Sequence, residues 1–487
     1  MPPLTILSQA QLRSLLLSLT SDEITTLQQG LADALRQYST GSQDQGCSSS
    51  YQPQRTAITR ANGCTTLFLP ASTGQTIGMK MISLQDGDKA GCAVESGTNI
   101  PETEKASTRS RSRTGRGSMT SQSSETSEQS AASSQDEDDE RDGDGGSSGA
   151  PSSSHKSSLP SGTVNQQPIT STTTAPNVSE TLGAWPGAGT RDTSPQGSVT
   201  LLDEESLPFG LINAHELTPF RTALTAMMLF IKRTKVKTLA VFGAGKQAYW
   251  HIRLALTLRG SEIKRVHIFN RSFDRAAKLL QDIYSPENSS WRGDVKFSAV
   301  SSEFGDYTRI VGEAVRKSDA IFCCTPSIEP LFPAELLTSR DGRRKGRLVS
   351  AIGSYKPHMT ELHPDILRDE VTVHGTSHRH LHKYIKRSGV VVVDGLDAAL
   401  KEAGEIMQAD VKPHQAVEIG ELLMVREASR QDPSEKAADD TKSLREWLER
   451  GNVIYKSVGL GLMDLVTGGD LLRLARERNL GTTVEEF

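Results

Sequence analysis

The chain has 487 residues, and its 55 Lys and Arg against 59 Asp and Glu give a formal net charge of −4. This balance provides no basic field, so we expect no nucleic-acid partner. The start MPPLTILSQAQLRS lacks the charged lead and long apolar stretch of a signal peptide, and no run reaches the length of a membrane helix. We therefore expect a cytoplasmic protein without membrane contact. Five cysteines without metal or disulfide spacing fit a reducing compartment.

The first 85 residues predict a small α+β unit. An apolar strand at residues 4–7 is followed by Ser8, which can cap a helix with leucines at helical spacing. Thr20 and Glu23 form a capping box at the start of a second helix. Short apolar runs bounded by turn residues predict strands at residues 65–70, 78–84, 199–203 and 209–213.

A long polar stretch separates these strands. Between residues 86 and 184 there is no Phe, Tyr or Trp, and Ser, Thr, Gly, Pro and charged residues predominate. Such a composition cannot bury enough apolar area to offset the loss of chain entropy. We therefore predict a disordered, low-complexity insertion over residues 86–196, which serves as a linker or as a tether regulated by phosphorylation.

A helix at residues 216–233 then leads into a strand, a glycine-rich turn and a second helix. An apolar run at 239–242 is typical of a buried parallel strand, and a second strand at 265–269 completes a βαβ unit around the helix 246–259. Glycines in such a turn allow tight bending and close approach of the backbone to a pyrophosphate. We expect a dinucleotide to bind at Gly243, Ala244, Gly245, Gln247 and Ala248.

The end of the second strand indicates which nicotinamide cofactor is used. The chain has Asn270, Arg271 and Ser272 where an NAD site usually has an acidic residue. A guanidinium with neighbouring amide and hydroxyl groups can bind a ribose 2′-phosphate through charge-assisted hydrogen bonds. We predict NADP(H) as the cofactor, with NAD(H) less favoured.

The remaining elements complete an α/β architecture. Strands at 320–324, 348–352 and 390–394 extend the parallel sheet, helices follow, and a last strand at 452–457 precedes a helix at 460–477 that we expect to return to the first unit. The predicted fold is a Rossmann-type doubly wound parallel sheet inserted in a smaller α+β domain, with the disordered Ser-rich insertion. The predicted domains are a smaller substrate-binding domain of residues 1–85, 197–220 and 452–487, the insertion 86–196, and an NADP-binding domain of residues 221–451.

We predict no catalytic or metal-binding role for three further groups of polar residues. No Cys or acidic residue accompanies the histidines at 374, 378, 380 and 382, so we expect no metal site. The basic stretch 340–347 is interpreted as a solvated turn. Four glutamates on predicted helices are interpreted as lying on solvated or paired helix faces: Glu402, Glu405, Glu418 and Glu421.

Seven blocks of the chain, in order, resemble the ornithine cyclodeaminase and mu-crystallin family. They are LFLPAS, GMKMISL, LTPFRTALTA, GAGKQAYWH, AIGSYKPHMTEL, VVVDGLDAALKEAGE and YKSVGLGLMDL. The resemblance implies an NAD(P)-dependent enzyme whose smaller domain mediates formation of a homodimer. Members of this family reduce cyclic ketimines, convert ornithine to proline with loss of ammonia, or act on alanine, and some bind small ligands.

The resemblance places Arg55, Lys80 and Arg221 around an amino- or imino-acid substrate. Chemistry supports this use, because a guanidinium binds a carboxylate bidentately and a partly desolvated ammonium can act near the reacting nitrogen. The family positions that contact the cofactor are Thr222, Thr325, Pro326, Ile352 and Ser457.

Two positions differ from the cyclodeaminase pattern. Tyr355 stands where cyclodeaminases carry a catalytic aspartate, and Leu67 replaces a glutamate. Deamination and ring closure need a base that accepts protons from the amine, and a tyrosine is poorly suited to this at neutral pH. The sequence therefore predicts an NADPH-dependent reductase of cyclic ketimine carboxylates, with Lys80, Arg55 and Arg221 as its catalytic residues. The alternatives are an NAD-dependent ornithine cyclodeaminase and a non-catalytic protein that binds NADP or a small ligand.

Overall fold

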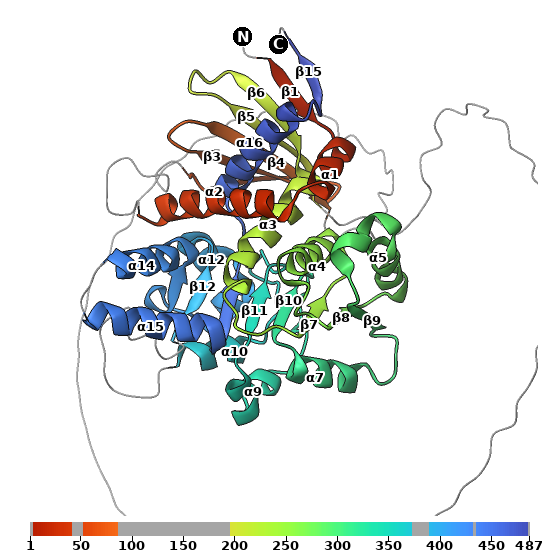
Figure 1. Cartoon of the computed structure of the whole chain (residues 1–487), viewed down its shortest axis with the longest axis vertical. Coiled ribbons are helices and arrows are strands. Elements are labelled where there is room, and N and C mark those ends of the chain that lie inside the picture. The colour runs from red at the N-terminus through yellow and green to blue at the C-terminus, as the bar shows by residue number, and fades with distance from the viewer. Residues whose placement is uncertain (1–2, 41–51, 86–194, 373–388, 432–434, 486–487) are drawn as a thin grey trace, which may run out of the picture. The chain divides into compact units, whose positions relative to one another are not determined.

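The computed structural model describes residues 3–40, 52–85, 195–372, 389–431 and 435–485 (Figure 1). Of the predicted disordered insertion, residues 86–194 lie outside the described part, as do the histidines at 374–382. Gln196, the last residue assigned to the insertion, is the first residue of a strand.

An eight-stranded sheet forms the centre of the larger domain. Every neighbouring pair of its strands is parallel, and the order is β13-β12-β14-β11-β10-β7-β8-β9. The strands are β7 (Thr238–Phe242), β8 (Arg265–Asn270), β9 (Lys296–Ser301), β10 (Ala320–Cys323), β11 (Leu348–Ala351), β12 (Val391–Val393), β13 (Ala416–Glu418) and β14 (Val453–Lys456).

The strand order locates the expected ligand crevice. The chain proceeds from β7 through β8 and β9 in one direction and then through β10 and β11 in the other, so the order reverses between β7 and β10. In doubly wound sheets, ligands bind outside the carboxyl ends of the strands at this reversal. The glycine turn follows β7 and therefore lies at this position.

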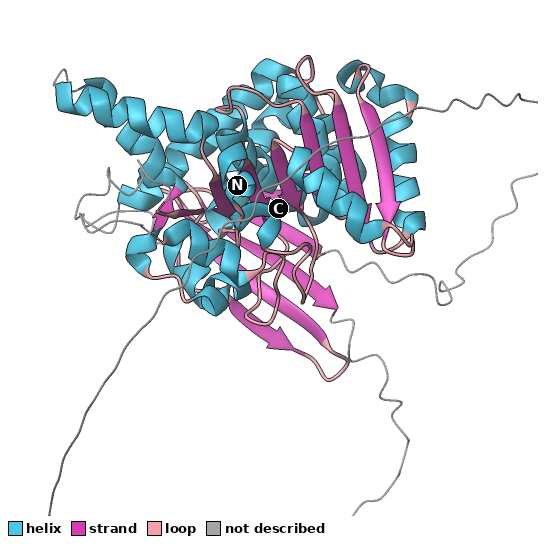
Figure 2. Ribbon diagram, turned by 90° about the horizontal axis from the view of Figure 1, so that it is seen from below, coloured by secondary structure: helices cyan, strands magenta, loops and turns pink. Residues whose placement is uncertain are grey.

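Both faces of the sheet are buried, which explains why its strands are continuously apolar. Leu239 and Val241 of β7 belong to one hydrophobic cluster, whereas Ala240 and Phe242 belong to another on the opposite face. Figure 2 shows helices along the sheet. The helices of this domain are α4 (Lys246–Arg259), α5 (Phe273–Tyr284), α6 (Ser289–Arg292), α7 (Tyr307–Lys317), α8 (Glu335–Thr338), α9 (Arg340–Lys345), α10 (Pro364–Val371), α12 (Leu396–Glu402), α13 (Gly404–Ala409), α14 (Ile419–Gln431) and α15 (Glu435–Arg450).

A seven-stranded sheet forms the smaller domain, in the order β15-β1-β6-β5-β4-β3-β2. Its pairs are antiparallel except for β1 with β6. The strands are β1 (Leu4–Leu7), β2 (Thr56–Thr59), β3 (Cys64–Ser72), β4 (Ile77–Gln85), β5 (Gln196–Leu202), β6 (Pro208–Asn213) and β15 (Thr482–Val484). Helix α16 (Gly461–Glu477) packs on β3, β4 and β5, and the other helices are α1 (Gln9–Leu17), α2 (Ser21–Thr40) and α3 (Ala214–Phe230) (Figure 1).

Side chains alternate between the two faces of β4. Lys80 and Ile82 point to the face covered by α16 and are buried, whereas Ile77, Met79 and Met81 point the other way and are 42 to 44% exposed. The smaller sheet therefore has an apolar outer face.

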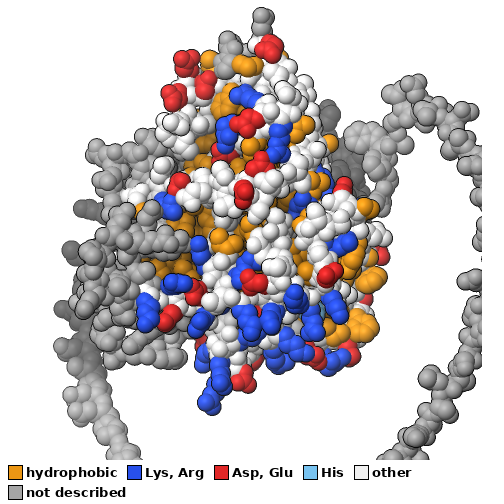
Figure 3. Space-filling view, viewed as in Figure 1, with side chains coloured by type: hydrophobic (Ala, Val, Ile, Leu, Met, Phe, Trp, Pro, Cys, Tyr) orange, Lys and Arg blue, Asp and Glu red, His pale blue; other side chains and the backbone are white. Residues whose placement is uncertain are grey.

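The predicted fold class is confirmed: a Rossmann-type parallel sheet accompanies a smaller α+β domain. Two details differ from the sequence analysis. β14, assigned to the smaller domain by the boundary at residue 452, pairs with β11 and β12 in the parallel sheet. The basic stretch interpreted as a turn forms the short helix α9 instead, in a region where Lys and Arg side chains gather (Figure 3).

Candidate active site

The glycine turn after β7 has the geometry of a phosphate-binding loop. Gly243 has a φ of 110°, and a Cβ atom there would lie 2.7 Å from the carbonyl oxygen of Cys324. Gly245 is the N-cap of α4 without a side-chain cap, and a Cβ atom at Gly245 would meet nothing within 4 Å. The first-turn amides of α4 thus begin beside open space, which suits a pyrophosphate.

A buried carboxylate joins the carboxyl ends of β10 and β11 next to this turn. The amide of Thr325 donates to Oε1 of Glu361 at 2.7 Å, and the amide of Gly353 donates to Oε2 at 2.6 Å. Burial raises the pKa of Glu361 to about 7. Glu361 therefore fixes Thr325 beside Gly243, whose Cβ would lie 3.2 Å from the Thr325 methyl carbon.

The residues at the end of β8 lie where a ribose is expected. Asn270 donates through Nδ2 to the carbonyl oxygen of Ser272 at 2.8 Å, and Ser272 is the N-cap of α5. Arg271 lies between them with an exposed side chain. The order β7-β8 in the sheet puts Arg271, directly after β8, at the end of the strand next to the one that the glycine turn follows.

The other predicted cofactor residues follow strands of the same sheet, apart from Thr222 on α3. Pro326 is exposed after β10, and Ile352 follows β11 with 9% exposure. The Ser457 hydroxyl, after β14, donates to Oδ2 of Asp394 at 2.6 Å. The Thr222 hydroxyl donates to the carbonyl oxygen of Thr218 at 2.8 Å.

Lys80 of β4 and Arg221 of α3 meet at one buried carboxylate. Nζ of Lys80 donates to both oxygens of Asp464 at 3.0 Å, and Nη2 of Arg221 lies 3.2 Å from Asp464 Oδ2. Lys80 is 2% exposed, Arg221 4% and Asp464 0%. Burial lowers the pKa of Lys80 to about 8, while the attraction of Asp464 opposes this shift.

The loop between β14 and α16 supports Arg221. Gly459 has a φ of 93°, and a Cβ atom there would lie 2.9 Å from Nη2 of Arg221. Asp394, at the end of β12, accepts hydrogen bonds from the amides of Gly459 at 2.7 Å and Val458 at 3.1 Å. The guanidinium therefore lies against a glycine that a buried carboxylate holds in place.

Arg55 precedes β2 and reaches the loop after β11. Its Nη2 donates to the carbonyl oxygen of Tyr355 at 3.1 Å, and its guanidinium also forms an ion pair with Glu402 of α12. Burial lowers the pKa of Arg55. Arg55 and Arg221 both act electrostatically on Lys80, so the three predicted substrate-binding cations lie in one region.

These contacts form a continuous row along the carboxyl edge of the parallel sheet. The glycine turn, Thr325 and Gly353 follow the neighbouring strands β7, β10 and β11. Gly459 follows β14, the next strand in the order, and contacts Arg221. The predicted cofactor loop and the cation cluster are thus joined by adjacent strand ends.

The sequence analysis missed the acidic partners of these cations. Asp464 lies within the quoted block YKSVGLGLMDL, and its place in the first turn of α16 was a usable signal because acidic residues favour that position. Two glutamates that were interpreted as lying on solvated or paired helix faces have cationic partners: Glu402 pairs with Arg55, and Glu405 is fully buried 3.1 Å from Nζ of Lys456.

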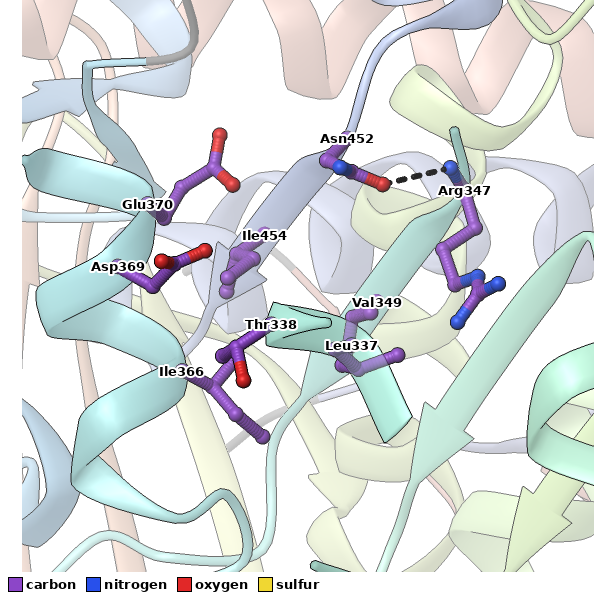
Figure 4. Close-up of a pocket in the computed structure, with 9 residues that line it drawn as sticks. All are labelled: Leu337, Thr338, Arg347, Val349, Ile366, Asp369, Glu370, Asn452 and Ile454. Atoms are coloured by element: carbon purple, nitrogen blue, oxygen red, sulfur yellow. Dashed lines mark hydrogen bonds between the residues drawn. The ribbon is translucent and has the colours of Figure 1, made fainter. Parts of the chain in front are cut away.

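A pocket at the opposite edge of the sheet does not belong to this row (Figure 4). It lies among the amino ends of β11 and β14 and helices α8 and α10. The amide of Arg347 donates there to Oδ1 of Asn452 at 3.2 Å, and burial raises the pKa of Glu370. Ligands of doubly wound sheets bind at the carboxyl edge, so this pocket is not the candidate site.

Two features are absent from the described residues. No group of three or more His, Cys, Asp and Glu among them is placed to hold a metal ion. Within the same ranges, no helix is both long and apolar enough to cross a membrane.

The fold and the row of contacts define a dinucleotide-binding protein of the doubly wound α/β class. The sequence model of the ornithine cyclodeaminase/mu-crystallin family matches residues 192–377. The resemblance inferred from the sequence is confirmed over these residues, and the members of that family are NAD(P)-dependent reductases and cyclodeaminases.

Related proteins agree with this assignment. The chain is 28% identical over 298 residues to a Delta(1)-pyrroline-2-carboxylate reductase of Bacillus cereus, covering 59% of this chain and 74% of that protein. It is 26% identical over 278 residues to the ketimine reductase mu-crystallin of Rattus norvegicus, covering 56% of this chain and 67% of the relative.

Solved structures agree on the fold. A Delta(1)-pyrroline-2-carboxylate reductase of Thermococcus litoralis, in complex with NADH and L-proline, has a TM-score of 0.56 and 16% identity, covering 99% of this chain and 100% of that chain. An archaeal alanine dehydrogenase dimer with bound NAD has a TM-score of 0.55 and 15% identity, covering 100% of both chains.

Proposed function

We propose that the protein is an NADPH-dependent reductase of cyclic ketimine carboxylates or related imino acids. The observation that carries the proposal is that Lys80 and Arg221 meet at Asp464. This cluster lies at the same edge of the parallel sheet as the glycine turn. A buried cluster with more cations than anions favours a substrate with a carboxylate.

The residues of the chain have separate tasks in this reaction. The Arg221 and Arg55 guanidinium groups bind the substrate carboxylate, and Lys80 in its ammonium form lies ready to stabilise charge and protonate the nitrogen. The glycine turn, Thr325 and Ser457 hold the dinucleotide, which supplies a hydride for the imine carbon. Exclusion of water and correct orientation of the substrate contribute much of the rate.

Substrate binding and dinucleotide binding are assigned to the two different sheets. We propose a substrate-binding domain from residues 1–85, 197–220 and the chain after β14, and a dinucleotide-binding domain from the parallel sheet and its helices. Lys80 of the first then faces Arg221 of α3, the helix that follows β6 of the smaller sheet.

The proposal is tested by adding pyrroline-2-carboxylate or piperideine-2-carboxylate to purified protein with NADPH and following cofactor absorbance. Oxidation of NADPH with formation of proline or pipecolate is expected. Production of ammonia and proline from ornithine with catalytic NAD would instead support cyclodeamination. Tight binding of NADPH without turnover of any imine would support a non-catalytic binding protein.

Arg271→Ala is expected to weaken NADPH binding by about 10- to 100-fold, because a charge-assisted hydrogen bond to the ribose phosphate is lost. NADH binding is expected to change little. Fluorescence titration of both cofactors measures this difference. Arg275→Ala, an exposed arginine one turn further along α5, is the matched control. Equal losses for NADPH and NADH at position 271 would contradict the proposed NADP preference.

We propose that the apolar outer face of the smaller sheet forms a homodimer. Ile58, Ile77, Met79 and Met81 expose 55, 42, 44 and 44% of their surface on β2 and β4, and contiguous exposed apolar patches mark interaction sites.

Met81→Asp is expected to shift a dimer to monomer in light scattering after size exclusion, because a charge would be buried in the interface. Met407→Asp, at a methionine 43% exposed on α13, serves as the control and is expected to leave the mass unchanged. A wild-type protein that is monomeric at micromolar concentration would contradict the proposal.

A further inference from the structure

Asp464 is the acidic partner of Lys80 and Arg221, and the proposed reaction gives it no role of its own. Asp464 is fully buried in the first turn of α16 and lies 384 residues from Lys80 in the sequence. Its two oxygens accept hydrogen bonds from Lys80, and Arg221 forms an ion pair with the same group. The Thr218 hydroxyl adds a longer contact of 3.4 Å.

Three charged residues outside β4 act electrostatically on Lys80. Asp464 belongs to α16 and Arg221 to α3, while Arg55 precedes β2. The neighbours of Lys80 on the adjoining strands, Leu69 of β3 and Val199 of β5, carry no charge. Among the described residues, Asp464 is thus the acidic group that favours the ammonium form of Lys80.

Without this carboxylate, two buried cations would face each other. Burial and the neighbouring guanidinium groups both favour loss of the proton from Lys80. A deprotonated Lys80 could neither attract the substrate carboxylate nor donate a proton. Asp464 thus separates the charges of Lys80 and Arg221 and keeps both side chains in place.

We propose that Asp464 is a positioning residue, which holds Lys80 protonated and fixed against Arg221 for a substrate carboxylate. The role in the reaction rests on the proposed function. The contact itself is tested without activity.

The activity-independent test is a double-mutant cycle on unfolding with Lys80→Met, Asp464→Asn and the double variant. Asp464→Asn is expected to unfold at a lower temperature than wild type at pH 7, because Lys80 and Arg221 lose their anion. Adding Lys80→Met to this variant is expected to raise the unfolding temperature by at least about 3 °C, since it removes one of the two buried cations. Destabilisations that simply add would overturn the proposal, and Asp470→Asn, in the same helix, is the control.

The catalytic test compares pH profiles of NADPH oxidation with pyrroline-2-carboxylate. In wild type the rate is expected to fall as pH rises through about 8, where Lys80 loses its proton. In Asp464→Asn the fall is expected at least about one pH unit lower, because an opposite charge this close raises an ammonium pKa by one to three units. An unchanged midpoint in a folded variant that binds NADPH normally would overturn the proposal.

The two tests separate this inference from the proposed function. If wild type reduces no imine, the reductase proposal fails, while the double-mutant cycle still decides whether Asp464 holds the charge of Lys80. If wild type is active and the cycle shows no coupling, only the role of Asp464 fails.

Discussion

A Lys80→Met variant is expected to lose reductase turnover by a factor of about 10² to 10⁴, the usual contribution of a positioned proton donor. Methionine fills a similar volume in the strand without a charge. Asp464 keeps Arg221 as its partner, so the buried carboxylate is not left alone. Initial rates of NADPH oxidation with pyrroline-2-carboxylate measure the loss.

The pH dependence identifies the cause of that loss. Lys80 is protonated below about pH 8, so the wild-type rate falls as pH rises through that value. The residual rate of Lys80→Met is expected to lack this fall. Lys401→Met, at an exposed lysine on α12, is the control for a general loss of positive charge. Full activity of Lys80→Met with unchanged pH dependence would remove Lys80 from the reaction.

The strand, turn and helix of the proposed dinucleotide site could be predicted from the sequence because their signals are local. The apolar strand, the glycines at 243 and 245, and the helix 246–259 are contiguous, and strand, turn and helix formation depend on neighbouring residues. Thr325, Ile352 and Ser457 came from the family resemblance, and each of them follows an apolar run that was predicted as a strand. A parallel sheet brings all such ends to one edge.

The acidic half of the site could not be predicted in the same way. Asp464 contacts Lys80 across 384 positions of sequence, and Glu402 meets Arg55 from another domain. Nothing in the local pattern of a glutamate on a helix distinguishes a solvated face from a buried ion pair. The strand β14 was assigned to the wrong unit for a similar reason, because its partners β11 and β12 are distant in the chain.

Gly459→Ala is expected to raise the KM for the imino acid by about 100-fold, because the new methyl group would lie 2.9 Å from Nη2 of Arg221 and displace it. The φ of 93° adds backbone strain, which an alanine tolerates poorly. NADPH affinity is expected to fall much less than substrate affinity, since the glycine turn and Thr325 lie elsewhere on the sheet edge and only Ser457 is near Gly459. Steady-state kinetics and cofactor titration separate the two effects.

A matched substitution in the adjoining helix distinguishes displacement of Arg221 from a general effect of adding a methyl group. Gly469 lies in α16, and a Cβ atom there would meet nothing within 4 Å. Gly469→Ala is therefore expected to leave KM unchanged and to stabilise the helix slightly. If Gly459→Ala instead keeps the wild-type KM, the guanidinium of Arg221 does not bind the substrate carboxylate from this position. The carboxylate would then depend on Arg55, whose pairing with Glu402 must open first.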